Sequence, residues 1–457
     1  MAPRRLLFLE QFPWLITFAV GIYLSATPPA FARTWYVKAD GTGEAPTIQA
    51  GIDSAGAGDI VLVAPGIYSS TVQVQVAGQA TAVNAYIAKN ISLRSESGAA
   101  VTKIDASGSD IGIVLAGVGA NAEVSGFEVT VLPELIGCVL LKGGARVSSA
   151  LDRIAIRCDG STCVIHDNFI HDADIGIKLN ASSATISSNV FDNVAVGVDG
   201  HTSSDAMVMN NSATDFGEAF SFADSSPHIL GNKITNADGA SYSCRGIACV
   251  SSGPSSAFAP TISGNTIVDL ANEAIWCNSV TPTVSGNVLK GTSGAVFFFC
   301  PQVAFHDNLS ILNASGVELQ SSTGSISGNT FDGNGDGVLL SYSDASISGN
   351  IIHRGGNGID CLSSSWTISC NDVFGANQPY SGCPDQSGLN GNFSADPQFC
   401  GIAGSGNYYL QSDSPCVPGN HPDGTDCGLI GARATNCSTV RTNSATWGQM
   451  KAMYRDK

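Results

Sequence analysis

The chain has 457 residues, a formal net charge of −17 at pH 7, and only 13% charged residues. Globular chains carry about 25% charged residues, and here glycine, serine and asparagine take their place. This composition is typical of a β-rich, turn-rich protein and argues against a mainly helical one.

The first 32 residues have the three parts of a secretory signal peptide. Arg4 and Arg5 make a basic start, Phe12–Leu24 is an apolar run, and residues 30–32 form a small-residue cleavage site. The run is shorter than the roughly 20 residues that span a bilayer. We therefore predict cleavage rather than a membrane anchor, and a mature protein that is secreted or held at the cell surface without a transmembrane segment.

All 14 cysteines lie beyond this segment. An even number of cysteines in an exported chain favours disulfides, and no spacing typical of a cysteine metal site occurs. Three pairs are candidates. Cys158/Cys163 and Cys244/Cys249 share one spacing, and Cys277 and Cys300 lie about one repeat apart.

A phrase close to Thr-Ile-Ser-Gly-Asn returns through the middle of the chain. Its asparagines are Asn168, Asn189, Asn211, Asn232, Asn265, Asn287, Asn308, Asn329, Asn350 and Asn371. Successive gaps are 21 or 22 residues, apart from one gap of 33. A fixed period in this range predicts a solenoid.

Three columns of the aligned repeats are apolar, at three residues before, two residues after and nine residues after the asparagine. The third column contains Ile177, Val198, Val296, Val317, Val338 and Ile359. Short strands with inward residues on a period of two, separated by glycine turns, predict an all-β right-handed parallel β-helix. We expect a single solenoid with three strands per coil of about 21 residues, and a short N-terminal capping helix.

The asparagines are expected to be structural. A polar side chain between inward apolar residues needs partners, and stacked asparagines can bond to one another or to turn backbone. Ten identical residues do not make a substrate site, so we interpret them as a ladder.

The expected organisation is a signal peptide (1–32), an N-terminal cap and first coil (33–70), β-helix repeats (71–375), a cysteine-rich C-terminal cap (376–437) and a tail (438–457). A helix is expected within Thr47–Ala55, where Ile48 and Ile52 share a face. Beyond Asn371 the period is expected to be lost.

The long gap predicts a loop over Gly239–Ser255, stapled by Cys244 and Cys249. This loop either forms the wall of a binding groove or is an insertion without a function. The tail is a frayed terminus or a docking tail.

Both ends of the mature chain carry a resemblance. The opening segments Tyr36-Val37, Pro46–Asp53 and Asp59–Tyr68, and the closing segments Ser394–Phe399, Tyr409–Pro415 and Gly428–Ala432, resemble those of secreted pectin-lyase-like β-helix proteins. That superfamily includes pectate lyases, polygalacturonases, pectin methylesterases and uncharacterised bacterial surface proteins. The catalytic signatures of its enzyme branches are absent, so the resemblance is to the uncharacterised branch and implies the fold rather than a reaction.

These features favour a secreted protein that binds, and in one version of the hypothesis cleaves, an extracellular polysaccharide. If it is an enzyme, a polysaccharide lyase or glycoside hydrolase is expected; the alternative is a non-catalytic structural or adhesive surface protein.

Between Leu179 and Ala432 the lysines and arginines are few: Lys233, Arg245, Lys290 and Arg354. An acidic solenoid repels anionic glycans, so a neutral or Ca²⁺-bridged glycan fits better. Calcium is the one cofactor that we consider. We expect no nucleic-acid partner, no dedicated metal site and a monomer.

Candidate ligand-binding residues lie in one expected outward stripe that follows the glycine turn. It consists of Trp276, Phe297, Glu318, Leu339 and Asp360, of which Leu339 is not itself a candidate. Trp276 and Phe297 are expected to stack on sugar rings. Glu318 and Asp360, two coils and roughly 10 Å apart, are near the separation of an inverting glycosidase pair.

Two Asp/His pairs on adjacent coils are further candidates, His171 with Asp192 and Asp332 with His353. A carboxylate that orients an imidazole can serve as a general acid or base. The candidate catalytic residues are therefore Glu318, Asp332, His353 and Asp360. The structural alternative is that outward columns of a β-helix hold polar residues by default.

Overall fold

The computed structural model describes residues 32–132, 153–236, 244–253, 257–401 and 407–437. The expected signal peptide, apart from residue 32, and the expected tail lie outside the described residues, as does part of the expected loop after Asn232. The unit described below is the one that begins at Arg33.

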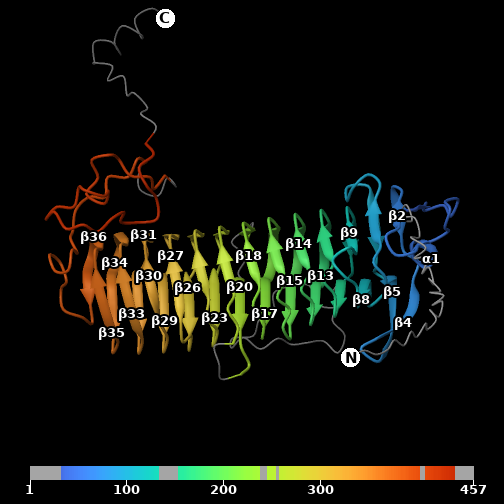
Figure 1. Cartoon of the computed structure of the whole chain (residues 1–457), viewed down its shortest axis with the longest axis horizontal. Helices are drawn as coiled ribbons and strands as arrows, with labels where there is room; N and C mark the ends of the chain where they lie inside the picture. The colour runs from blue at the N-terminus through green and yellow to red at the C-terminus, as the bar shows by residue number, and fades with distance from the viewer. Residues whose placement is uncertain (1–31, 133–152, 237–243, 254–256, 402–406, 438–457) are drawn as a thin grey trace, which may run out of the picture. The chain divides into compact units, whose positions relative to one another are not determined.

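Each coil contributes three strand segments. In the coil of Asn329 these are β30 (Thr323–Ser327), β31 (Thr330–Asp332) and β32 (Asp336–Ser341). Each pairs in parallel with the matching segment of the next coil, and successive coils lie side by side in chain order (Figure 1). The predicted right-handed parallel β-helix, a single solenoid, is confirmed.

The first segments of the coils form one sheet of 14 strands. Besides β30 it contains β1 (Thr34–Val37), β2 (Ile60–Val63), β6 (Ser92–Ser95), β9 (Glu123–Ser125), β12 (Val164–His166), β14 (Thr185–Ser187), β16 (Met207–Met209), β18 (His228–Leu230), β21 (Thr261–Ser263), β24 (Thr283–Ser285), β27 (Val303–His306), β33 (Asp344–Ser348) and β35 (Ser365–Ser369).

The second and third segments form the other sheet. Its strands besides β31 and β32 are β3 (Gly66–Tyr68), β4 (Val72–Val76), β5 (Gln79–Ile87), β7 (Thr102–Asp105), β8 (Ile111–Ala116), β10 (Glu128–Thr130), β11 (Ile154–Asp159), β13 (Phe169–Asn180), β15 (Val190–His201), β17 (Ser212–Ala223), β19 (Lys233–Thr235), β20 (Arg245–Val250), β22 (Thr266–Val268), β23 (Ile275–Asn278), β25 (Val288–Lys290), β26 (Ala295–Phe298), β28 (Leu309–Ile311), β29 (Ser315–Gln320), β34 (Ile351–Leu362) and β36 (Asp372–Ser381). In β13, β15, β17, β34 and β36 the second and third segments of the coil form one continuous strand. Among the named strands, only β4 and β5 pair in antiparallel fashion.

The expected helix is present as α1 (Ile48–Ser54). Thr47 caps it by accepting a hydrogen bond from the Ala50 backbone N–H at 3.1 Å. Ile48 and Ile52 are buried against the first coils, and the Gln49 side chain accepts from the Tyr86 backbone N–H at 2.7 Å. The period of the apolar residues therefore located both the helix and its buried face.

The asparagine ladder runs through the buried turn between the first and second segments. From Asn189 onward, each Asn Oδ1 accepts from the backbone N–H and the Nδ2 of the preceding asparagine; for Asn308 and its predecessor Asn287 the distances are 2.9 and 3.0 Å. Each Nδ2 also donates to a carbonyl one coil back, as Asn308 does to Val284 at 3.0 Å. The structural interpretation of these residues is confirmed.

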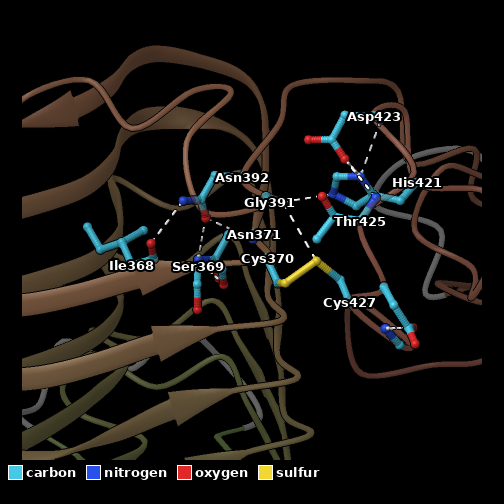
Figure 2. The surroundings of a disulfide bond; sticks show 12 residues. Ile368, Ser369, Cys370, Asn371, Gly391, Asn392, His421, Asp423, Thr425 and Cys427 are labelled. Atoms are coloured by element: carbon cyan, nitrogen blue, oxygen red, sulfur yellow. Dashed lines mark hydrogen bonds and ion pairs between the residues drawn. A yellow bond between two sulfur atoms is a disulfide. The ribbon is translucent and has the colours of Figure 1, made fainter.

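The ladder has one more member than the sequence predicts. Asn392 accepts from the backbone N–H and the Nδ2 of Asn371, both at 3.0 Å, and donates to Ile368 O (Figure 2). The expectation that the period ends at Asn371 was wrong. Asn392 stands 21 residues after Asn371, with the apolar Leu389 three residues before it, so the sequence does carry the period here, although Leu389 is exposed where other coils bury this residue.

A second ladder, made of serines, lies at the turn after the third segment. Ser161, Ser182 and Ser204 are buried, and the backbone N–H of each donates to the hydroxyl of the next serine at 2.9 to 3.2 Å, the last to Ser225. Ser322, Ser343 and Ser364 continue the pattern in later coils. The sequence analysis missed this ladder.

Three disulfides tie the C-terminal part together: Cys361–Cys383, Cys370–Cys427 and Cys400–Cys437. Figure 2 shows that Cys370–Cys427 joins the last ladder coil to the segment around His421. None of the three pairs expected from spacing is bonded. Cys158 and Cys163 have their sulfurs 3.5 Å apart, and Cys277 is register partner to Cys249 rather than bonded to Cys300.

The long gap does not produce one loop over Gly239–Ser255. Within it, β20 is a regular wall strand that pairs with β17 and β23. Cys244 and Cys249 are buried, and no disulfide joins them to each other, so this pair does not staple a loop. The expectation was wrong because the extra residues lie on both sides of a third segment that stays in the coil.

Candidate functional site

The third segments place one residue per coil in an outward stripe. Register pairing joins Trp276 to Val296, Val296 to Glu318, Glu318 to Leu339 and Leu339 to Asp360. Four of the five residues expected in the stripe therefore stand where the sequence predicts.

Phe297 was placed wrongly. It is fully buried and pairs with Cys277 and Leu319, both inward residues. The turn after Asn287 is one residue shorter than the turn after Asn308, so the register moves by one position. Because side chains alternate between the two faces of a strand, this shift turns Phe297 inward and Val296 outward.

Trp276 is half-buried beneath an ionic cluster. The Arg245 guanidinium lies 4.4 Å from the centre of the Trp276 ring, in cation–π geometry. Arg245 also forms ion pairs with Glu218 and Glu273, both at 3.1 Å. One face of the indole is thus taken by the protein's own arginine, which comes from the region expected to form a loop.

Glu318 and Asp360 are both partly exposed, with Leu339 between them. Glu318 accepts a hydrogen bond from the Gln320 amide. Among the described residues no hydrogen bond or ion pair joins Glu318 or Asp360 to Asp332 or His353. The four catalytic candidates therefore lie on two separate columns, the second and third segments.

Asp332 and His353 form the expected contact on adjacent coils, with His353 Nδ1 3.0 Å from Asp332 Oδ1. Asp332 is fully buried, however. Arg354 donates to both its oxygens at 2.7 Å, and the Tyr408 hydroxyl donates to Oδ2 at 2.7 Å. Burial alone would raise the pKa of Asp332, but the bonds from His353, Arg354 and Tyr408 hold it below its usual value. This is the environment of an ion-paired anchor for the C-terminal segment.

The other Asp/His pair is adjacent in register but not bonded. His171 contacts Glu128 at 3.1 Å and Asp172 at 2.8 Å, whereas Asp192 accepts from the Thr214 hydroxyl. Glu128 also pairs with Lys103 at 2.9 Å. Burial raises the pKa of Glu128, and the bonds from Lys103 and His171 more than offset this, so the pKa is lowered.

Two exposed aromatic residues lie beside the stripe and were not among the sequence candidates. Phe299 is 60% and Tyr342 is 69% exposed. Both follow a third segment directly, at the position that Ser321 occupies in the coil between them. The alignment on asparagine contained this signal for Tyr342, which stands where the coils before and after carry Ser321 and Ser363; the shorter turn after Asn287 moves Phe299 out of that column.

In the described part of the chain no group of three or more His, Cys, Asp or Glu side chains is arranged to hold a metal ion. In the same residues, no helix is long and apolar enough to cross a membrane.

The class of protein is set by the strand pairing. The fold is a right-handed parallel β-helix, which is the fold that the resemblance at the two ends of the chain implied.

Comparisons with known proteins match this chain in part. Residues 245–384, less than half of the chain, match the family model described as periplasmic copper-binding protein (NosD). No curated protein matches.

Several solved structures are similar, all at low identity. The A-module of the Azotobacter vinelandii mannuronan C-5 epimerase AlgE6 is 13% identical, with 77% of this chain and 95% of that chain covered and a TM-score of 0.39. The catalytic unit of a GH87 α-1,3-glucanase from Streptomyces thermodiastaticus strain HF3-3 is 14% identical, with coverages of 80% and 70% and a TM-score of 0.43. The pectate lyase Pel9A is 13% identical, with coverages of 88% and 96% and a TM-score of 0.34.

Proposed function

We propose that the protein binds a neutral extracellular polysaccharide on the outer face of its third segments. The observation that carries the proposal is the register that aligns Trp276, Glu318 and Asp360 on one stripe. An aromatic face beside carboxylates is suited to sugars, whose C–H faces stack on rings and whose hydroxyls donate to carboxylate oxygens.

The charge of this face supports a neutral ligand. The third segments β26, β29 and β32 contain Glu318 and Asp336 and no lysine, arginine or histidine. Arg245, which lies over the Trp276 ring, is already paired with Glu218 and Glu273. A polyuronate would meet uncompensated like charge. Calcium could bridge an anionic ligand to the carboxylates, and this version is tested by adding a chelator.

Binding is favoured over cleavage by the placement of the acids. Asp332 is buried and held in its charged form by Arg354, so it is not free to exchange a proton with a substrate. Among the described residues, neither Asp332 nor His353 makes a hydrogen bond or ion pair with Glu318 or Asp360. The three disulfides support a site of action outside the cytoplasm.

Binding should be measured by affinity electrophoresis and pull-down on a panel of neutral and acidic glycans, with and without EDTA. We expect retardation by at least one neutral glycan, and a loss of about tenfold or more in affinity for Trp276→Ala and Glu318→Gln. Tyr36→Ala and Glu96→Gln change exposed residues of the same types near the N-terminus and should leave binding intact.

The same incubations report on catalysis. New reducing ends or unsaturated products would show that the protein is an enzyme, contrary to the non-catalytic form of this proposal. If no glycan is retained under any condition, the polysaccharide proposal fails and a structural role becomes the better hypothesis.

A further inference from the structure

The turn that follows each third segment forms a column along the solenoid, here called the corner column. Its members in five successive coils are Ser279, Phe299, Ser321, Tyr342 and Ser363. All five have left-handed backbone, with φ between 48° and 58°. The backbone N–H of each of the first four donates to the last strand residue of the next coil at 2.9 to 3.0 Å, so the column is held in register.

Phe299 and Tyr342 are unusual occupants of this column. Left-handed backbone is unfavourable for bulky side chains, and serine stands at the other three positions. Phe299 and Tyr342 are also 60% and 69% exposed, so little burial offsets the strain. Folding alone therefore does not account for two aromatic rings at these positions, and such outliers are a recognised sign of function.

The residues that immediately precede the corner column include no lysine, arginine or histidine. The outward residues that immediately precede the column are Asn278, Phe298, Gln320, Ser341 and Leu362. The Gln320 amide donates to Glu318, which links the corner column to the stripe of the proposed binding site. The Phe298 and Phe299 rings have their centres 5.9 Å apart, which widens the apolar surface at this coil.

We propose that Phe299 and Tyr342 form a stacking platform for a neutral polysaccharide chain that lies along the solenoid axis at the corner column. The inference rests on the proposed function and adds a second set of contacts, together with the direction of the ligand. Phe299, Ser321 and Tyr342 stand on three successive coils, so the two aromatic positions are about 10 Å apart along the axis.

This spacing suits an extended glycan. A pyranose unit of an extended chain advances by about the spacing of one coil, so sugars n and n+2 would meet the two rings while Ser321 leaves room for sugar n+1. The C–H groups on the face of a sugar carry partial positive charge and meet the negative face of an aromatic ring. Gln320, Glu318 and Ser341 offer donors and acceptors for the hydroxyls at the edge of the chain.

A second copy of the chain is the main competing occupant. Two isolated rings separated by a serine make a narrow apolar surface, well below the about 800 Å² per partner of a stable interface. A repeating ligand, by contrast, matches a repeating surface. We therefore commit to the glycan, and self-association becomes an outcome of the test.

The test uses Phe299→Ser, Tyr342→Ser and the double variant, because serine is the residue that the same column carries in neighbouring coils. Leu312→Gly is the matched control: Leu312 is 51% exposed with left-handed backbone at a different corner, whose neighbouring coils carry Gly291 and Gly333. Circular dichroism and thermal unfolding verify the fold of each variant. Binding is measured by affinity electrophoresis in gels containing a soluble neutral β-glucan, an α-glucan or alginate.

We expect each single variant to weaken binding to a neutral glycan about tenfold, and the double variant to abolish retardation, with Leu312→Gly unchanged and alginate not bound. Retained affinity in the double variant, together with lost affinity in Trp276→Ala and Glu318→Gln, would overturn the platform and leave the proposed function intact. If the corner variants lose glycan affinity and the stripe variants keep it, the platform is supported and the binding site is the corner column rather than the stripe. A concentration-dependent dimer that dissociates on Phe299→Ser, with no glycan bound by any form, would overturn both.

Discussion

Asp372 is a buried carboxyl in the last ladder coil, with few groups to stabilise its charge. Its Oδ1 accepts from the Ala395 backbone N–H at 3.0 Å, and Cys416 Sγ lies 3.3 Å from its Oδ2. Burial dominates over these two bonds and raises its pKa from 3.8 to about 7. The folded protein therefore holds this proton more tightly than the unfolded chain does.

This difference predicts a loss of stability as the pH rises. The contribution of Asp372 is fully present below about pH 4, falls as the pH rises toward 7, and is gone above it. We expect the free energy of unfolding to fall by about 2 kcal/mol between pH 5 and pH 8 through this group. Asp372→Asn should remove that part of the pH dependence, as measured by urea unfolding at both pH values.

The comparison between the two proteins isolates Asp372 from other titrating groups. The pKa of Asp332 is lowered by its partners, so its contribution is lost only as the pH falls through that lowered value, outside this window. An identical pH dependence in the wild type and in Asp372→Asn would contradict the prediction.

At the scale of the element, the asparagine ladder connects each coil to the next. Asn308 is fully buried, and its Oδ1 accepts from two donors of Asn287. Asn308→Ala leaves the buried Asn287 backbone N–H without its acceptor and removes one of the two bonds of Asn287 Nδ2, which still donates to Ile262 O at 2.9 Å. A buried donor left without a partner costs about 1–3 kcal/mol. We expect a loss of about 3 kcal/mol in the free energy of unfolding, measured by chemical denaturation.

A matched substitution shows whether the loss comes from the ladder. Asn377 is exposed on β36, and Asn377→Ala should change stability by less than about 0.5 kcal/mol. Equal effects at the two positions would mean that the ladder bonds add little to the fold.

The elements also show how far the sequence alone could be read. The ladder and the apolar columns were visible because every coil repeats the same local contacts. Phe297 was misplaced because a turn shorter by one residue reverses the faces of a strand. The burial of Asp332 was not predictable from the repeat, because its partner Tyr408 is 76 residues away in sequence.

The candidate site was predictable only in part for the same reason. Register placed Glu318, Leu339 and Asp360 correctly in one stripe, but the arginine over Trp276 comes from the irregular gap. The serine ladder depends on the shape of a turn rather than on an apolar pattern. Sequence periodicity therefore predicts what repeats, and the contacts of the proposed site that it missed lie where the repeat is broken.

At the scale of the whole molecule, the solenoid is a chain of nearest-neighbour contacts. Each coil pairs only with the coils before and after it, so its stability is close to a sum of coil and interface contributions. A whole coil should therefore be removable. Deleting residues 190–211 joins Asn189 to Ser212 and leaves Asn189 one period from Asn232, with Ile170 facing Ala213 in place of Phe191.

We expect this deletion to fold with the same β-type circular dichroism and a cooperative transition. Its Tm should fall by about 2–4 °C for each kcal/mol lost where Ala213 replaces the ring of Phe191. Deleting residues 190–200, half a coil, should abolish folding, because β15 (Val190–His201) is lost while β16 (Met207–Met209) remains and every later strand leaves its register. If both deletions fold equally well, or if neither folds, the nearest-neighbour description is contradicted. In a nearest-neighbour solenoid, removing a whole coil keeps the register of the later strands, whereas removing half a coil does not.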